Sequence, residues 1–337
     1  MNNDIKVSVI VITYNHEQFI KQALDSILMQ KVDFKYEILI GDDASTDRTP
    51  EILKEYKKLY PDIIDLHLNS VNLGATRNAY NLLMIAKGKY LAYCEGDDYW
   101  IHDHKLQIQV EFLEKNNNYI GCSHKCVLVD KNNKKLLWQK LDWIKNIKIF
   151  KFKDFSGGRF LPGQTTTIVK KNIFLDKNVD YTVLYSSDRD ISDRIANEIF
   201  LLKGDFYILS LFMSAYRISN TQNYNSITFK KFKNNKNKYL DEMFITEALE
   251  KYAKTQNVNV IFKIKRCEIF SDIAVNFFRY RELKYLNILI ENYKFYKTPW
   301  YAIIYCPYYI FLKIYRKVIR FITIKIKTFF KGEWNYG

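Results

Sequence analysis

The sequence contains little glycine and proline, with 11 and 5 of these residues among 337. This scarcity argues against a loop-dominated or low-complexity protein, because those classes are rich in both residue types. Cysteine is also scarce, and its five residues have no regular spacing. An odd number of irregularly spaced cysteines predicts reduced thiols in a cytosolic protein. No long apolar run follows the N-terminus, so we expect no secretory signal and a cytoplasmic location.

Apolar and basic residues, by contrast, are abundant. Apolar residues make up 48% of the chain, which is enough for a sizeable core. The formal net charge is +15, and the region from Lys230 onward is rich in Lys and Arg. This bias predicts an anionic partner, which could be a nucleic acid, an acidic membrane surface or a phosphorylated substrate. Composition alone does not choose among these three.

Short β-branched runs alternate with segments of helical periodicity through the first hundred residues. The expected strands are Val7 to Ile12, Tyr36 to Ile40, Ile63 to Leu68 and Tyr90 to Cys94. The expected helices between them are His16 to Gln30, Asp47 to Tyr60 and Thr76 to Lys87. This alternation predicts an α/β fold with a mostly parallel, doubly wound sheet and right-handed crossovers.

The pattern becomes mixed after Asp103, and we expect a domain boundary near Asn225. Residues 1–225 would form the α/β domain, in two parts covering 1–115 and 116–225, and residues 226–337 a helical, basic extension. The expected elements of the second part are a helix over 105–115, a strand over 120–129, a helix over 186–202, and strands over 206–209 and 212–217.

Three acidic residues follow the last strand of the first part, in Glu95-Gly-Asp97-Asp98. In open α/β sheets, ligands bind beyond the carboxyl ends of the strands, which is where these residues stand. Carboxylates this close repel one another unless a cation lies between them. Hard oxygen donors of this kind suit Mg²⁺ or Mn²⁺, which also bind substrate phosphates. The alternative is a solvated acidic turn.

A second polar segment, Gly41 to Asp47, follows the second strand. Ser45 or Asp47 can cap the next helix, and Pro50 fits its first turn. Capping needs only one such residue, which leaves Asp42 and Asp43. A carboxylate at a strand end can accept a hydrogen bond from a uracil imide or a ribose hydroxyl, and capping alone is the alternative.

Two further side chains could contact a nucleotide. Tyr14 follows the first strand and could stack on a base, although an isolated tyrosine is equally compatible with a core or surface position. Arg77 could pair with a pyrophosphate, because its guanidinium matches phosphate geometry.

Four motifs in order carry a family resemblance. They are Val7 to Asn15, Gly41 to Asp47, Asn72 to Gly74, and Cys94 to Trp100. Together they resemble the N-terminal half of glycosyltransferase family 2, which is inverting and has the GT-A fold, in its bacterial surface-polysaccharide type. The resemblance is strong over residues 5–115 and continues more weakly to about Ser219.

The resemblance implies a donor site for a nucleotide-sugar, expected to be a UDP-sugar, with Mn²⁺ or Mg²⁺. The residues implied in the nucleoside pocket are Thr13, Tyr14, Asn15, Asp42 and Asp43. Arg77 would lie near the base or the phosphates. Glu95, Asp97 and Asp98 match the acidic metal motif, with Asp97 and Asp98 nearest the ribose and the metal. Glu95 departs from the pattern, because Asp is commoner at that position.

The resemblance also implies a catalytic base at the start of the 186–202 helix. Asp188 aligns best with the family's aspartate, and Asp190 is the second candidate. Ser187 stands where the family usually has Glu, so a helix-terminal acid favoured by the dipole is the alternative for Asp188. Arg217, in Tyr216 to Ser219, would approach the diphosphate.

These parts imply inverting transfer of a sugar to a hydroxyl of a glycan or lipid-linked saccharide. The Gln-x-x-Arg-Trp motif of processive synthases is missing, so a single addition is expected. Residues 313–331 form a basic amphipathic pattern that could lie on an anionic inner membrane or pack on the catalytic domain. We expect no nucleic-acid partner.

Two other functions compete with this interpretation. A nucleotidyltransferase generally has a Gly-rich, basic loop after its first strand, and Thr13 to His16 does not resemble one. A non-enzymatic basic module on a degenerate transferase fold would bind membrane or nucleic acid and would be expected to lose the acids. Asp43, Asp97, Asp98 and Asp188 are all present.

Overall fold

The computed structural model describes residues 5–136, 147–156, 164–185, 192–218 and 246–257, together with residues 266, 269–271 and 273. The chain divides into two compact units, Met1–Lys230 and Lys231–Gly337. The first unit contains the α/β sheet. In the second unit, residues 246–255 are helical.

Strands and helices alternate along the first part of the chain, as the sequence predicts. The strands are β1 (Ile5–Thr13), β2 (Lys35–Asp42), β3 (Ile64–Leu68) and β4 (Tyr90–Tyr93). The helices between them are α1 (Ile20–Leu28), α2 (Thr49–Leu59) and α3 (Ala75–Ile85). Each expected element is present with ends shifted by a few residues.

These strands belong to a nine-stranded sheet whose main path runs β3-β2-β1-β4-β8-β6-β9-β5. The first four strands are parallel. The others are β5 (Tyr99–Trp100), β6 (Tyr119–Val129), β7 (Ile149–Phe150), β8 (Val169–Lys171) and β9 (Asp205–Arg217). The β8 strand is antiparallel to β4 and β6, whereas β6 and β9 are parallel. The predicted fold class, a mostly parallel doubly wound α/β sheet, is therefore confirmed.

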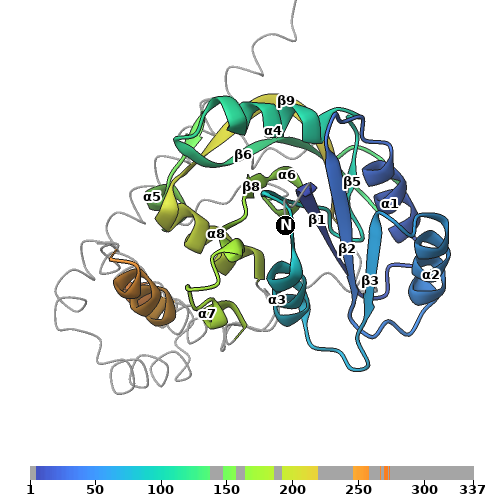
Figure 1. Cartoon of the computed structure of the whole chain (residues 1–337), viewed down its shortest axis with the longest axis horizontal. Helices are drawn as coiled ribbons and strands as arrows, with labels where there is room; N and C mark the ends of the chain where they lie inside the picture. The colour runs from blue at the N-terminus through green and yellow to red at the C-terminus, as the bar shows by residue number, and fades with distance from the viewer. Residues whose placement is uncertain are drawn as a thin grey trace, which may run out of the picture. The chain divides into compact units, whose positions relative to one another are not determined.

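Helices cover both faces of the parallel strands. In Figure 1, α1 and α2 lie on one side of β1 to β3 and α3 lies on the other. The core on the first side includes alternate residues of β1 (Val7, Val9 and Val11), which is the period of a strand with one face toward these helices. It also includes α4 (Lys105–Lys115), through Leu106 and Val110.

The opposite face is covered by α3, α7 (Thr182–Tyr185) and α8 (Ser192–Lys203), which contact one another. Ile199 and Phe200 of α8 are buried. The remaining short helices are α5 (Phe152–Ser156), α6 (Gln164–Thr167) and the single-turn η2 (Ile173–Leu175).

The second part differs from the expectation in its strands. The two strands expected over 206–209 and 212–217 are one continuous strand, β9. Its pairing with β6 shifts register on both sides of Lys125, and residues 210–212 opposite are exposed. That interruption of the burial pattern is why the sequence suggested two strands. The expected 105–115 helix is confirmed by α4, and the 120–129 strand by β6.

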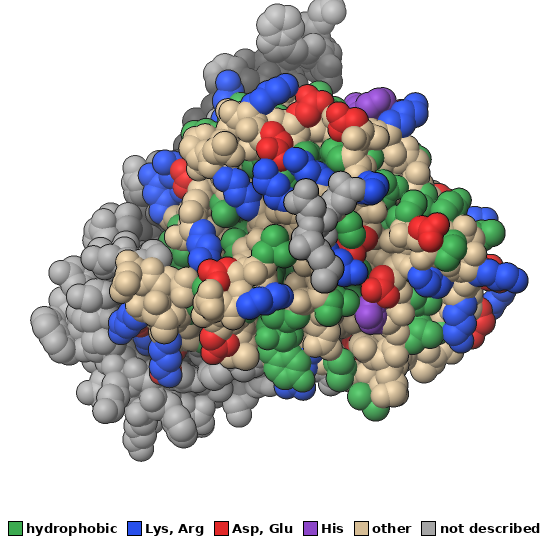
Figure 2. Space-filling model, viewed as in Figure 1, with side chains coloured by type: hydrophobic (Ala, Val, Ile, Leu, Met, Phe, Trp, Pro, Cys, Tyr) green, Lys and Arg blue, Asp and Glu red, His purple; other side chains and the backbone are tan. Residues whose placement is uncertain are grey.

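Charge on the described surface is mixed. On the face drawn in Figure 2, acidic and basic side chains are interspersed over the described elements. The basic 313–331 segment lies outside the described residues. Within the described part of the chain, no helix combines the length and the apolar character needed to cross a bilayer.

Candidate active site

The sheet topology creates one position where connections diverge. The chain leaves β1 through α1 on one face, whereas it reaches the neighbouring β4 through α3 on the other face. Such a switch point opens a crevice at the carboxyl ends of the two strands. The segments that follow these strands begin at Tyr14 and Cys94. They include the residues expected there, Tyr14, Asn15 and Glu95 to Asp98.

Gly96 brings these two segments into contact. Its N–H donates to the carbonyl of Ile12 at 3.1 Å. A Cβ on Gly96 would lie 2.7 Å from both Thr13 Oγ1 and His16 Nδ1, so only glycine fits without displacement. Thr13 Oγ1 and His16 Nδ1 are buried and have no hydrogen-bond partner within the described part of the chain. His16 was not predicted as a site residue, because an isolated histidine carries no positional signal.

The loop after β1 is tied to the loop after β2. Asn15 has a positive φ of 55°, and its N–H donates to Ser45 Oγ at 2.9 Å. Its side-chain oxygen accepts a hydrogen bond from the Thr46 N–H at 2.8 Å. Tyr14, in contrast, is 38% exposed just after β1. Asn15 therefore shapes the loop, while the Tyr14 ring faces solvent and could stack on a base.

Asp42 is buried at the end of β2 and organises its own loop. Ser45 donates to it twice, from its N–H at 3.0 Å and from its hydroxyl at 2.5 Å. Burial raises the pKa of the Asp42 carboxyl, while the Ser45 hydrogen bonds oppose this change. The following Asp47 accepts a hydrogen bond from the Thr49 N–H at 2.9 Å, at the start of α2. The N-cap of α2 is Arg48, which has no side-chain capping bond, so the predicted capping by Ser45 or Asp47 is wrong and Asp47 only bonds the first turn from outside.

Asp43 connects β2 to the start of α3. One carboxylate oxygen accepts the Leu73 N–H at 2.8 Å and the Asn69 side-chain amide at 3.1 Å, and the other accepts the Gly74 N–H at 2.8 Å. The residue is only 4% exposed. Its predicted contact with a nucleoside stays a prediction, and the observed contacts give it a loop-anchoring role that the sequence did not indicate.

Replacing Asp43 with asparagine should lower the free energy of unfolding by about 2–3 kcal/mol. The asparagine side chain keeps one acceptor oxygen, but its NH₂ group would face a backbone N–H. One charge-assisted hydrogen bond would therefore be lost. Urea denaturation would measure the change. The exposed Asp62→Asn is the matched control and should change stability by less than about 0.5 kcal/mol. Equal effects in both variants would contradict the anchoring role.

The acids after β4 differ in their exposure. Glu95 and Asp97 are half-buried, whereas Asp98 is 1% exposed. Asp98 accepts hydrogen bonds from the Thr166 hydroxyl at 2.6 Å and from the Arg217 N–H at 2.8 Å. Burial, and then the negative charges of Asp97 and Glu95, raise the pKa of Asp98 well above its usual value.

Arg217 is the side chain that joins the acidic segment to two other parts of the fold, the loop after β6 and α1. Its Nε donates to the Asp97 carbonyl at 2.7 Å. One terminal nitrogen donates to the carbonyls of Asp130 and Lys131 at 2.9 and 3.2 Å. The other donates to Gln22 Oε1 of α1 at 3.0 Å.

Two aromatic rings lie against the same guanidinium. Its carbon is 4.4 Å from the centroid of Phe19 and 5.6 Å from that of Tyr99. With 4% of the residue exposed, the Arg217 side chain mainly contacts protein. The predicted approach of Arg217 to a diphosphate stays a prediction. The described contacts show that Arg217 holds the acidic segment in position.

Arg77 lies on the exposed side of α3. Its guanidinium carbon is 5.1 Å from the centroid of the Tyr185 ring in α7, which in turn packs edge-on against Tyr80. These contacts join α3 to α7. The predicted contact of Arg77 with a base or a phosphate stays a prediction.

A comparison with known families now decides the classification. The sequence pattern described as glycosyl transferase family 2 matches residues 8–184, more than half of the chain. The chain belongs to glycosyltransferase family 2. The resemblance inferred from the four motifs is therefore confirmed.

Relatives and solved structures agree with this family. An uncharacterized Mycobacterium tuberculosis protein is 38% identical over 144 residues, 42% of each chain. The poly(ribitol-phosphate) β-glucosyltransferase of Bacillus spizizenii is 39% identical over 98 residues, 28% of this chain and 15% of that protein. The chain thus spans less than half the length of these two relatives.

The S. aureus TarS 1–349 structure with UDP has a TM-score of 0.54 at 18% identity, covering 82% of this chain and 72% of that one. This structural likeness supports the fold.

Two of the family's expected positions cannot be placed. Asp188 and Asp190, the predicted candidates for the catalytic base, lie outside the described residues, just before α8.

The side chain that the sequence missed most clearly is Thr166, whose hydroxyl donates a hydrogen bond to Asp98. Threonine at a short helix carries no sequence signal for such a contact, since the residues are 68 positions apart.

The donor set after β4 fits a divalent metal ion by its chemistry. Asp97 and Asp98 supply carboxylates, and each Asp98 oxygen keeps a second lone pair beside its hydrogen bond. Mg²⁺ and similar ions are commonly held by one or two carboxylates plus substrate phosphates and water. The half-buried Asp97 is the more accessible of the two.

Proposed function

We propose that this family 2 glycosyltransferase is inverting and metal-dependent, and moves a single sugar from a UDP-sugar to a hydroxyl of a cell-surface glycan or lipid-linked saccharide. The observation that carries the proposal is the switch point of the sheet between β1 and β4. There the exposed Tyr14 ring and the Glu95 to Asp98 acids follow neighbouring strands, held together at Gly96. An exposed aromatic ring and carboxylates that follow neighbouring strands suit a base and a metal-bound diphosphate.

The relatives support this donor and acceptor class. TarS was solved with UDP. The Bacillus spizizenii relative is named for glucosylation of poly(ribitol phosphate). We extend both properties to this chain as part of the proposal.

In the proposed reaction, Tyr14 stacks on the base, and Asp97 and Asp98 would hold the divalent ion. That ion would supply positive charge to the departing diphosphate. Asp188 accepts the proton of the acceptor hydroxyl as its oxygen bonds to the anomeric carbon and the bond from that carbon to the diphosphate oxygen breaks. Attack from the face opposite the nucleotide inverts the anomeric configuration. Asp190 is the alternative base.

We also propose that residues 1–225 form the catalytic domain and that residues 226–337 form a helical, basic extension. The basic amphipathic pattern of residues 313–331 supports peripheral contact with an anionic membrane, where a lipid-linked acceptor would be found. Binding of the full chain to anionic but not neutral vesicles would test this contact.

Asp97→Asn should abolish stabilisation by UDP and Mn²⁺ together. In the wild-type protein, ligand at a hundred times its Kd raises the free energy of unfolding by about 2.7 kcal/mol. Thermal melts with UDP, with Mn²⁺, with both and with neither measure this effect. Turnover of a panel of nucleotide-sugars should fall by more than the roughly 10–100-fold that loss of an outer-shell partner costs.

Asp33→Asn is the matched control, because Asp33 is exposed just before β2, away from the strands' carboxyl ends. It should keep both the stabilisation and the turnover. Asp97 is preferred to Asp98 for this test, since Asp98 is buried in contacts with Thr166 and Arg217. Turnover of only GDP- or dTDP-sugars would refute the UDP preference, and metal-independent turnover would refute the metal role.

A further inference from the structure

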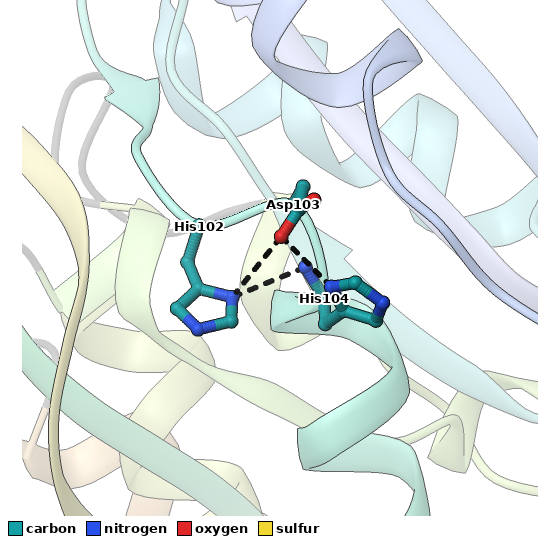
Figure 3. A group of neighbouring side chains, drawn as sticks. All are labelled: His102, Asp103 and His104. Carbon is teal, nitrogen blue, oxygen red and sulfur yellow. Dashed lines mark hydrogen bonds and ion pairs between the residues drawn. The ribbon is translucent and has the colours of Figure 1, made fainter.

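Three metal-ligating side chains lie together in the loop between β5 and α4, outside the acidic segment. His102, Asp103 and His104 each offer one ligand atom, and these atoms all lie within 4.8 Å of one another. Figure 3 shows both imidazole rings with a nitrogen directed toward the Asp103 carboxylate. His104 Nδ1 is 2.8 Å and His102 Nδ1 is 3.8 Å from Asp103 Oδ1. In a tetrahedral Zn²⁺ site, bonds near 2.0–2.1 Å put neighbouring ligand atoms roughly 3.3 Å apart, so small side-chain rotations would suffice.

We propose that His102, Asp103 and His104 form a second metal site, which binds a divalent transition-metal ion such as Zn²⁺. Two imidazole nitrogens and one carboxylate, with water completing the coordination, suit Zn²⁺. The acids at Asp97 and Asp98 offer only oxygen and suit Mg²⁺ or Mn²⁺. The two sites therefore differ in the ions they select.

The backbone that carries the three donors is held in place by the end of α1. Gln30 donates to the His102 carbonyl at 2.8 Å and accepts the Leu106 N–H at 3.0 Å. The Lys31 N–H donates to the Asp103 carbonyl at 2.7 Å. Because the loop is already ordered, an ion would have to fix only side-chain rotamers, which reduces the entropic cost of binding.

The two oxygens of Asp103 have different partners. Oδ2 pairs with the Lys31 ammonium at 2.7 Å, which leaves Oδ1 facing the imidazoles. A group that orients a metal-ligating carboxylate from outside the coordination sphere is a usual part of such sites.

The imidazole of His102 presents one of its nitrogens as a hydrogen-bond acceptor. The backbone N–H of His104 points at His102 Nδ1 from 3.1 Å, so this nitrogen carries a lone pair in the neutral ring. An ion would replace this contact and the bond from His104 Nδ1 to Asp103. The positive charge of Lys31 and the N-terminus of α4 oppose a cation, so the expected Kd is micromolar and not nanomolar.

The donors are open to solvent, so an ion needs no path into the core. The side chains of His102, Asp103 and His104 are 37%, 39% and 48% exposed. In Figure 2, histidine side chains lie at the surface of the described face beside basic residues.

The test is Zn²⁺ titration of the full chain, purified without a polyhistidine tag, by calorimetry in excess Mg²⁺. We expect one equivalent of Zn²⁺ with a micromolar Kd, and His102→Ala and His104→Ala should each weaken it by about tenfold or more. Asp103→Asn, which keeps the shape of the side chain, should also weaken binding. Melting temperatures in chelator establish that each variant is folded.

His67→Ala is the matched control. His67 Nε2 lies 3.3 Å from Asp65 Oδ1, and among the described residues these two side chains belong to no group of three possible metal ligands. His67 should therefore be dispensable for Zn²⁺ binding. Asp97→Asn should also keep Zn²⁺ binding. The proposal is overturned if no saturable binding occurs below millimolar Zn²⁺, if folded His102 and His104 variants bind as the wild type does, or if Asp97→Asn abolishes binding.

Discussion

Replacing Arg217 with alanine is expected to lower the free energy of unfolding by about 4 kcal/mol or more, an effect of the size seen when a buried hydrogen-bond network is broken. The substitution would take their Arg217 donor away from the carbonyls of the half-buried Asp97 and Asp130 and of the exposed Lys131. It would also leave a cavity between Phe19 and Tyr99. The midpoint and slope of a urea unfolding curve measure the loss.

Two further variants provide the control and the conservative comparison for Arg217→Ala. Arg48 is exposed, so Arg48→Ala should stay within about 0.5 kcal/mol of the wild type. Arg217→Lys keeps the charge but cannot supply donors in four directions, so it should recover only part of the loss. If Arg217→Ala were as mild as Arg48→Ala, the network would not contribute to stability.

The second large effect concerns Lys105, which is fully buried at the start of α4. Its ammonium nitrogen has no hydrogen-bond partner within the described residues and lies 4.2 Å from the centroid of the Trp100 ring. Burial lowers the pKa of Lys105 from 10.5 to about 7. The neutral amine is therefore the form that the fold tolerates.

The direction of the pH effect follows from proton binding. Above pH 7 the unfolded chain still holds the Lys105 proton while the folded chain has released it, so stability rises with pH. The maximum slope for one proton is about 1.36 kcal/mol per pH unit, which gives up to about 2 kcal/mol between pH 7 and 8.5. Burial raises the pKa of Cys122 to about 12, which opposes the rise in stability above pH 8.5. Burial lowers the pKa of His124, and this shift affects stability only below pH 6.5.

Lys105→Met removes the titrating group and should flatten this rise relative to the wild type. The substitution should also stabilise the protein at pH 7 and below, where the buried ammonium is most costly. Lys115→Met, on the same helix but 75% exposed, should keep the wild-type profile. Urea unfolding at several pH values compares the three proteins, and identical slopes for all three would refute a neutral Lys105.

The first part of the fold was predictable because its information is local. Each strand of β1 to β4 and each helix of α1 to α3 carries its own periodicity, so the order of elements alone implies the parallel sheet. The later part was less predictable. The strands β5, β7 and β8 have two or three residues each, too few to show a period, and they exist because a neighbouring strand offers unpaired backbone groups.

The candidate site was likewise predictable from the sequence only in part. Tyr14 and the Glu95 to Asp98 acids were predicted to meet because both follow parallel strands, and they do follow the neighbouring strands β1 and β4. The partners of the acids were not predicted. Arg217 stands 120 residues from Asp97 and was expected at a diphosphate, yet its guanidinium donates to backbone carbonyls and to the Gln22 side chain.

The sequence by itself determined the family, the alternating order of strands and helices, and the edge of the sheet at which the polar residues gather. These features depend on residue periodicity and on short motifs, which are legible along the chain. The tertiary structure alone decided which of those polar groups are buried and what holds them. Burial and hydrogen bonding depend on contacts between segments far apart in the chain, which no local pattern records.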